Sequence, residues 1–291
     1  MPKGLEKKSA ELSAFHATVL AAGEIYFRDL PWRHTHDPYG IWISEVMLQQ
    51  TQVKRVDGRW QRWLERFPDI SALAGATSAE VLEEWQGMGY NRRALSLLEA
   101  ARTIMKTSKE LPCDSAELVT LPGIGTATAA GIRAFAFDLP SVYLETNVRT
   151  VFLHELFPAE LDVADSRIIP LVEASCPKDA DNPLDDPRSW YYALLDYGAH
   201  LKKVMPNPSR RSRSHVRQSA FEGSHRQKRA ELLRILLKHT DGLTLKVLVY
   251  EMSELEQRAG RAPLFEPEIL DLLNELTAEG FCRYNNGIWT I

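Results

Sequence analysis

The sequence predicts an all-α protein that ends in a smaller helical module with a terminal β-hairpin. From Glu11 to about Ala199, apolar residues recur at helical spacing over successive stretches of about ten to twenty residues, and no stretch alternates as a strand does. Prolines separate these stretches, as they do at helix boundaries. At 291 residues, the chain is long enough for a well-buried core and two domains.

The composition is that of an ordinary globular protein, with 44% hydrophobic and 25% charged residues. No apolar run approaches the roughly 18 residues of a membrane span, and residues 3–8 lack the apolar stretch of a signal peptide, so we expect a cytoplasmic protein without a membrane partner. Cys113, Cys176 and Cys282 are too scattered to predict a disulfide framework or a CxxC metal site.

Residues 202–229 interrupt the helical pattern with a concentration of positive charge. This segment contains nine Lys or Arg residues and one acidic residue, Glu222, so it carries +8 while the rest of the chain carries −12. One interpretation is a solvated linker, which we place at residues 202–225. The other is contact with phosphates, because clustered arginines neutralise a nucleic-acid backbone.

After this segment, three stretches with helical periodicity precede "FCRYNNGIWTI", in which Asn286-Gly287 predicts the tight turn of a hairpin. The helices are expected at residues 229–240, 245–259 and 267–280. This order predicts a winged-helix-like domain over residues 226–291, and a packing or dimerisation module remains an alternative. Winged helices often read DNA, but the glutamates of the second helix make it acidic and weaken that interpretation.

The stretch "LVTLPGIGTATAAGIRAF", residues 118–135, predicts a short helix, a tight turn and a second helix rich in small residues. Gly123 and Gly125 permit another molecule to approach the backbone closely, and the N–H groups that open the second helix at Thr126 can bind a phosphate. The stretch resembles the helix-hairpin-helix motif of DNA repair proteins. On the glycines alone, a helix corner without a ligand is the simpler interpretation.

Glu45 lies where a helix would bury it. Helical spacing puts Ile41, Trp42 and Leu48 around its carboxyl group. Burial disfavours the anion, so we expect Glu45 to keep its proton near neutral pH. The alternative is a buried glutamate that is paired with an arginine.

Five blocks of the sequence together resemble the adenine DNA glycosylase family of the MutY type. They are, in chain order, residues 29–53, 82–97, 121–131, 142–151 and 192–200. The resemblance is specific because all five blocks must coincide, and it covers about residues 15–200 but not the C-terminal region. It implies a helix-hairpin-helix DNA glycosylase fold of two helical subdomains over residues 1–201.

The resemblance implies that Glu45 donates a proton to N7 of adenine while a second carboxylate steadies the positive charge that develops on the sugar. The family has aspartate at the second position, where this chain has Glu145, which keeps the charge but adds a methylene. Asn147 matches a residue that helps hold the site, although asparagine is also a common helix N-cap. Bifunctional relatives have a nucleophilic lysine at the position of Ala127, so we expect water to be the nucleophile.

Further matches concern the flipped base and the duplex. The residues that fall on positions lining the adenine pocket are Arg28, Trp32, Arg33, Asn147 and Asp196. Taken singly, they fit a core tryptophan and structural ion pairs equally well. Gln50 and Tyr90 match residues inserted beside the opposite, oxidised guanine, and we expect Gln49 to contact DNA next to them. For Tyr90 alone, core packing is the simpler interpretation.

Two departures separate this chain from the family. The family binds a [4Fe-4S] cluster through four cysteines after the block that ends at residue 200, whereas the corresponding stretch here has no cysteine, so we expect no cluster. In its place we expect Arg210, Arg211 and Arg213 to contact phosphates, and a monovalent cation at the helix-hairpin-helix is left open. We also expect the family's C-terminal domain that senses 8-oxoguanine to be missing, with the winged-helix-like module in its place.

We therefore expect a nucleoid-associated, monomeric, monofunctional glycosylase that acts on double-stranded DNA with a mismatched or damaged base. Adenine opposite 8-oxoguanine or guanine is the expected substrate. One alternative keeps the chemistry and excises mismatched thymine or uracil, or another damaged purine. A second alternative is a protein that binds altered DNA without cutting it, with Glu145 marking a lost active site.

Overall fold

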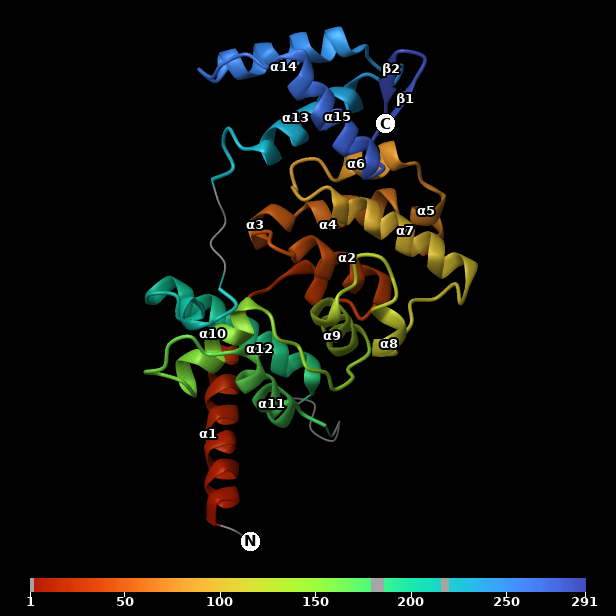
Figure 1. Cartoon of the computed structure of the whole chain (residues 1–291). Coiled ribbons are helices and arrows are strands. Elements are labelled where there is room, and N and C mark those ends of the chain that lie inside the picture. The colour runs from red at the N-terminus through yellow and green to blue at the C-terminus, as the bar shows by residue number, and fades with distance from the viewer. Residues whose placement is uncertain (1–2, 179–185, 216–219) are drawn as a thin grey trace. The chain divides into compact units, whose positions relative to one another are not determined.

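The computed structural model describes residues 3–178, 186–215 and 220–291, and over these residues the chain is almost entirely helical (Figure 1). The only strands among them form one short antiparallel pair near the C-terminus. The predicted all-α class is therefore confirmed. None of the described helices has the length and apolar character needed to cross a membrane.

The chain divides into two compact units. The first comprises Met1–Val46 and Leu111–Arg217, and the second comprises Met47–Glu110 and Gln218–Ile291. The first division falls inside helix α2, Pro38–Leu48.

The predicted domain boundaries, which give a glycosylase domain at residues 1–201, a linker at 202–225 and a C-terminal domain at 226–291, stay predictions. Part of the predicted linker, residues 216–219, lies outside the described residues.

The first unit is a set of helices around an aromatic core. Besides the start of α2, its elements are α1 (Lys3–Ile25), the 3₁₀ helix η1 (Pro31–Arg33), α8 (Ser115–Leu118), α9 (Thr126–Ala136), α10 (Thr146–Glu155), α11 (Asp165–Ser175), α12 (Pro187–Val204) and the 3₁₀ helix η2 (Pro208–Arg211). Helix α12 packs against both α1 and α10. The ring centroid of Phe15 on α1 lies 4.9 Å from that of Phe152 on α10 and 6.0 Å from that of Trp190 on α12. Three helices therefore share one core.

Two glycines let these helices approach one another closely. A Cβ atom on Gly23 of α1 would lie 2.4 Å from the Cβ of Ala193 on α12. A Cβ atom on Gly198 of α12 would lie 2.2 Å from the backbone oxygen of Asn147 on α10. Both distances are far below van der Waals contact, so a side chain at either position would push the helices apart.

An extended segment ahead of α10 is held in place by tyrosines. The Tyr191 hydroxyl on α12 donates to the backbone oxygen of Ser141 and accepts a hydrogen bond of 3.2 Å from the backbone N–H of Tyr143. The ring of Tyr143 packs edge-on against Phe135 of α9, with 5.4 Å between the centroids. These contacts fix the direction of the segment before α10 begins at Thr146.

The second unit combines the helices between residues 47 and 110 with the C-terminal region. Its helices are α3 (Val53–Val56), α4 (Arg59–Arg66), α5 (Ile70–Gly75), α6 (Ser78–Glu84), α7 (Arg92–Lys106), α13 (His225–Lys238), α14 (Leu245–Arg258) and α15 (Glu266–Ala278). Trp63 and Trp85 are fully buried and meet edge to face at 5.5 Å. The Arg93 guanidinium donates to the backbone oxygens of Met47 and Gln49, at 3.1 and 2.6 Å, which ties the end of α2 and the residue after it to α7.

The C-terminal region has the predicted order of three helices and a hairpin. Strands β1 (Arg283–Asn285) and β2 (Ile288–Thr290) pair antiparallel. Asn286 and Gly287 have positive φ angles of 49° and 83°, so the predicted tight turn is confirmed. Assignment of the region to the winged-helix class stays a prediction.

The expectation that the glutamates of α14 make this helix acidic is wrong for Glu256. Glu256 is buried, and its carboxyl group accepts two hydrogen bonds from the Arg261 guanidinium, at 2.6 and 2.9 Å. These bonds lower the pKa of Glu256. The residue therefore forms a structural ion pair and contributes nothing to an acidic surface.

We predict that Gly198→Ala destabilises the protein by about 1–3 kcal/mol, because the added methyl group collides with the backbone of α10. Urea unfolding followed by circular dichroism measures the difference in the free energy of unfolding. Gly75→Ala in α5 is the matched control, because a Cβ atom there meets nothing within 4 Å. Equal effects of the two substitutions would contradict the prediction.

Candidate active site

The helix-hairpin-helix lies in the first unit, where α8 and α9 are joined by the turn that contains its two glycines. Gly123 has a φ of 79°, which glycine adopts without strain. Gly125 is the N-cap of α9, and a Cβ atom on it would meet nothing within 4 Å. No side chain caps α9, so the backbone N–H groups of Thr126 and Ala127 remain uncapped at the positive end of the helix.

Glu45 comes from α2, and its carboxyl group contacts α9 and the segment ahead of α10. Its Oε2 accepts a hydrogen bond from the Tyr143 hydroxyl at 3.1 Å. Gly131 of α9 makes room for this oxygen, because a Cβ atom there would lie 2.2 Å from it. Burial raises the pKa of Glu45 to about 8; the Tyr143 hydrogen bond opposes the rise, and the charge of Glu145 adds to it. The carboxyl group therefore keeps its proton at neutral pH, and its bonding partner is a tyrosine, not an arginine.

Glu145 is the N-cap of α10. Its Oε1 accepts hydrogen bonds from the backbone N–H groups of Asn147 and, at 3.0 Å, Val148. Burial raises the pKa of Glu145, while the charge of Lys202, the two backbone bonds and the charge of Arg149 oppose the rise. Bonds from the positive end of a helix favour the anion, so the start of α10 both orients this carboxyl group and supports its charge.

The structure brings the two predicted carboxyl groups together in the first unit, close enough for their charges to interact. Their surroundings differ. Glu45 is largely buried and accepts a hydrogen bond from a neutral hydroxyl, whereas Glu145 has two backbone donors and nearby cations. Different surroundings are what allow two carboxyl groups to act as an acid and an anion at one pH. The roles of Glu45 and Glu145 in a reaction stay predictions at this point.

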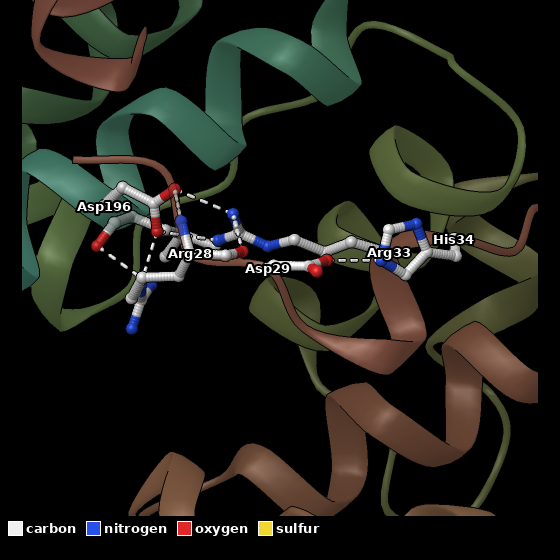
Figure 2. A network of polar contacts seen from close by, with 6 residues as sticks. Arg28, Asp29, Arg33, His34 and Asp196 are labelled. Carbon is white, nitrogen blue, oxygen red and sulfur yellow. Dashed lines mark hydrogen bonds and ion pairs between the residues drawn. The ribbon is translucent and has the colours of Figure 1, made fainter. Parts of the chain in front are cut away.

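Asp196 of α12 is held between two arginines (Figure 2). Its Oδ2 accepts from the Arg33 guanidinium at 2.7 Å and from the backbone N–H of Arg28 at 3.1 Å. Its Oδ1 accepts from Arg33 at 2.8 Å and from the Arg28 side chain. Four donors fill the acceptor positions of the carboxylate, which matches the structural ion-pair alternative. Figure 2 also shows the separate, exposed pair of His34 with Asp29. Contact of this network with a base stays a prediction.

Trp32 and Asn147 belong to the same unit. Trp32 is 3% exposed, as expected of a core tryptophan. The N-cap interpretation of Asn147 is wrong, because Glu145 occupies the N-cap of α10. The side-chain oxygen of Asn147 is buried and has no hydrogen-bond partner in the part of the chain that the structure describes. A buried acceptor without a partner costs free energy unless a ligand or water satisfies it.

Gln49, Gln50 and Tyr90 belong to the second unit. Gln50 and Tyr90 both have left-handed backbone, with φ angles of 52° and 51°. This conformation is uncommon for residues other than glycine, and such strain is often kept at functional sites. Tyr90 is 40% exposed, with the Arg93 guanidinium 5.5 Å from its ring centroid, so the core-packing interpretation is wrong. Insertion of these residues into DNA stays a prediction.

The three arginines of the basic segment have different surroundings. Arg211 donates to backbone oxygens at the C-terminal end of α10, including that of Leu153 at 2.6 Å. Arg213 pairs with Asp162 at 2.6 Å. Arg210 is exposed, and its guanidinium has no partner among the described residues. Phosphate contact stays a prediction for all three and is least obstructed at Arg210.

Three residues of this site are missed by the sequence reasoning. Tyr143 stands two positions before Glu145, and an alternating pattern in an extended segment is the signal that places both on one side. Gly131 is one of several small residues in α9, and the need for glycine there arises only from the approach of Glu45. Lys202 is counted in the sequence only as part of the basic segment.

The residues present do not fit a [4Fe-4S] cluster. Such a cluster is held by four thiolates, and the chain has three cysteines. No group of three or more His, Cys, Asp or Glu side chains gathers as a metal site within the described ranges. The stretch after α12 bonds to protein instead, with the backbone N–H of Val163 donating to Arg211 and its oxygen accepting from Arg213, both at 3.0 Å.

Comparisons with known proteins agree with this fold. Residues 43–182 match the model of the HhH-GPD superfamily base excision DNA repair proteins. The chain is 35% identical over 270 residues to an adenine DNA glycosylase of Mycolicibacterium smegmatis, covering 87% of this chain and 90% of that protein. An adenine DNA glycosylase of Mycobacterium tuberculosis is 44% identical over 126 residues, 43% of this chain and 41% of that protein. Among solved structures, a thermostable thymine-DNA glycosylase superposes with a TM-score of 0.59 at 22% identity, covering 69% of this chain and 92% of that one.

Fold and site thus define a DNA N-glycosylase of the helix-hairpin-helix class. The chain belongs to the HhH-GPD superfamily of base excision DNA repair proteins and, within it, to the adenine DNA glycosylase family. The predicted resemblance, the glycosylase fold and DNA as the partner are confirmed. The expectation that the resemblance stops at about residue 200 is wrong, because the match to the Mycolicibacterium smegmatis protein covers 87% of this chain, which is more than residues 15–200 contain.

We predict that Glu45→Gln stabilises the folded protein at alkaline pH. Between pH 4.5 and about 8 the folded state retains a proton that the unfolded chain has released, so wild-type stability is full below this range and falls as pH rises through it. A neutral amide avoids this loss, so the variant should gain about 2–4 kcal/mol near pH 9 and little near pH 4. Thermal unfolding at both pH values measures the gain, and a difference that did not change with pH would contradict the prediction.

We predict that Gly125→Ala weakens DNA binding about tenfold without lowering stability. Its Cβ atom meets nothing in the free protein, but it would stand between a phosphate and the start of α9. Fluorescence anisotropy with a duplex that contains a stable abasic analogue measures affinity, and thermal unfolding measures stability. Unchanged affinity of Gly125→Ala for this duplex would show that no phosphate lies against the hairpin. Gly75→Ala is the control for the effect of an added methyl group.

Proposed function

We propose that this protein is a monofunctional adenine DNA glycosylase that removes adenine paired with 8-oxoguanine or guanine. The observation that carries the proposal is the pair formed by a protonated Glu45 and the capped Glu145. The Mycolicibacterium smegmatis relative, which matches over 87% of this chain, is named an adenine DNA glycosylase, and that name is the basis for proposing adenine here. The protein would act as a monomer, without an iron-sulfur cluster.

The proposed reaction begins with proton transfer from Glu45 to N7 of a flipped adenine. A protonated base is a better leaving group, so the bond between C1′ and N9 breaks and both of its electrons stay with adenine. A pKa of about 8 suits this role, because the group is protonated at neutral pH yet acidic enough to give up its proton.

The second part of the reaction depends on charge next to the sugar. Loss of adenine leaves positive charge shared between C1′ and the ring oxygen, and the Glu145 carboxylate would stabilise it. A water molecule then adds at C1′, gives up a proton and leaves an abasic site. Ala127 offers no amine where bifunctional relatives have a lysine, so strand cleavage would require a later step.

The remaining residues support binding. The unpartnered side-chain oxygen of Asn147, two residues from Glu145, is an acceptor that a bound nucleotide would satisfy. The uncapped start of α9 would hold a phosphate, with a monovalent cation at the same turn as a further proposal. Arg210 would add a second phosphate contact. In the second unit, the strained Gln50 and Tyr90, with Gln49, would support the duplex from which the base has been flipped.

We predict that the wild-type protein forms alkali-labile abasic sites in duplexes with adenine opposite 8-oxoguanine or guanine. The panel includes thymine opposite guanine and uracil opposite guanine, and alkali treatment followed by electrophoresis reveals the product. Glu45→Gln should lower single-turnover excision by about 10²–10⁴-fold, because the amide keeps the shape but cannot donate the proton.

The control is the affinity of Glu45→Gln for the same duplex, which should match that of the wild type. Product from the thymine or uracil duplexes alone would replace adenine with a mismatched pyrimidine as the substrate. Tight binding without product from any duplex would support the non-catalytic alternative.

A further inference from the structure

Glu145 has to be charged in order to stabilise a sugar cation, yet its burial favours the neutral form. The ionisable groups that face it are Glu45 from α2, Tyr143 in its own segment, Arg149 from α10 and Lys202 from α12. Glu45 is neutral when it holds its proton and repels an anion when it does not, and Tyr143 is neutral. Neither favours a charge on Glu145. The charge of Glu145 therefore depends on the two cations and on the backbone bonds at the start of α10.

Arg149 is already bound to another carboxyl group. Its Nε and Nη2 donate to the two carboxyl oxygens of Asp165, each at 2.9 Å, and this bidentate pair lowers the pKa of Asp165. Arg28, the further cation near Lys202, is bound to Asp196 through its backbone N–H and its Nε. The charge of Arg149 is therefore largely balanced by Asp165, while Arg28 is held by Asp196, which it shares with Arg33.

Lys202 lies on the face of α12 that meets the start of α10. Gly198, four residues earlier and so on the same face, packs directly against the backbone oxygen of Asn147. Asn147 in turn donates its backbone N–H to Glu145. Lys202 is half-buried, and its amine makes no hydrogen bond or ion pair with any described residue. A cation without a carboxylate of its own therefore stands near Glu145, where water screens it only in part.

We propose that Lys202 is a positioning residue for the glycosylase reaction, whose ammonium group keeps Glu145 charged while Glu45 keeps its proton. The inference rests on the proposed function, because only that reaction requires the two carboxyl groups to differ in charge. Burial lowers the pKa of Lys202, and the charge of Glu145 raises it. The attraction between the two groups therefore favours the charged form of both. Lys202 acts through Glu145 and need not touch the base or the sugar.

The free protein provides the direct test, without DNA. Carbon-13 NMR of labelled glutamate carboxyl groups, with Glu145 assigned through Glu145→Gln, follows its titration in the wild type and in Lys202→Met. Methionine keeps most of the aliphatic side chain and removes the charge. We expect the pKa of Glu145 to rise by about one pH unit in Lys202→Met and to return to the wild-type value in Lys202→Arg.

Lys203→Ala is the matched control, because it removes the same charge from the next, exposed position. It should leave the titration of Glu145 unchanged. If Lys202→Met titrates like the wild type, or if Lys203→Ala has an equal effect, the proposal is wrong.

Single-turnover excision measured against pH gives a second readout. The acidic limb of the profile reports the ionisation of Glu145, so it should move upward in Lys202→Met, with about a tenfold lower rate below the limb and unchanged DNA affinity. An equal loss of excision rate at every pH would mean that Lys202 has only a structural role. Trapping of Lys202 on the abasic product by borohydride would mean that it acts as a nucleophile. Either result overturns the proposal. Absence of excision by the wild type would overturn the proposed function, whereas the NMR titration alone decides whether Lys202 acts on Glu145.

Discussion

The site depends on the enclosure of one carboxyl group. Glu45 loses most of its contact with water when α2 packs beside α9, and a charge there would be costly. The fold accommodates this carboxyl group because Gly131 leaves space for it and the Tyr143 hydroxyl donates a hydrogen bond to it. A proton held in this way is a structural requirement, and in the proposed reaction it is also the proton that Glu45 donates to the base. Packing and chemistry therefore constrain the same residues.

The second carboxyl group shows how the chain accommodates a glutamate where the family has aspartate. A side chain that is longer by one methylene would ordinarily be less well oriented. Here Oε1 of Glu145 turns back to its own helix and takes the N–H groups of Asn147 and Val148. The cap fixes the longer side chain, and the other oxygen makes no hydrogen bond among the described residues. One oxygen thus positions the group while the other remains available for a ligand.

Much of the fold was predictable from the sequence because its signals are local. Helical periodicity, proline punctuation, the Gly123 and Gly125 turn and the Asn286-Gly287 hairpin all act within a few residues. The raised pKa of Glu45 followed from its apolar neighbours on the same helix. Local reasoning also explains why the N-cap alternative for Asn147 is wrong: asparagine is the commoner cap, but Glu145 occupies this position.

The rest of the site could not be predicted because it depends on contacts between segments far apart in the chain. Tyr143 reaches Glu45 across 98 positions of the sequence. The saturation of Asp196 by two arginines is equally non-local, with 168 positions separating it from Arg28. The exposure of Tyr90 likewise depends on how the loop before α7 is tied down. The count of charges over the basic segment could not show that Arg210, Arg211 and Arg213 have different surroundings.

Helix α10 connects these features, because both of its ends are fixed. Its start is held against α12 at Gly198, where only glycine leaves enough space. Its end is held by Arg211, whose guanidinium donates to the backbone oxygen of Leu153 at 2.6 Å. The segment that carries Arg211 follows α12, in the stretch where the family resemblance implies the cysteines of a cluster. Ordinary hydrogen bonds therefore fasten this stretch to the end of α10, and close packing at Gly198 fixes the end of the helix that carries Glu145.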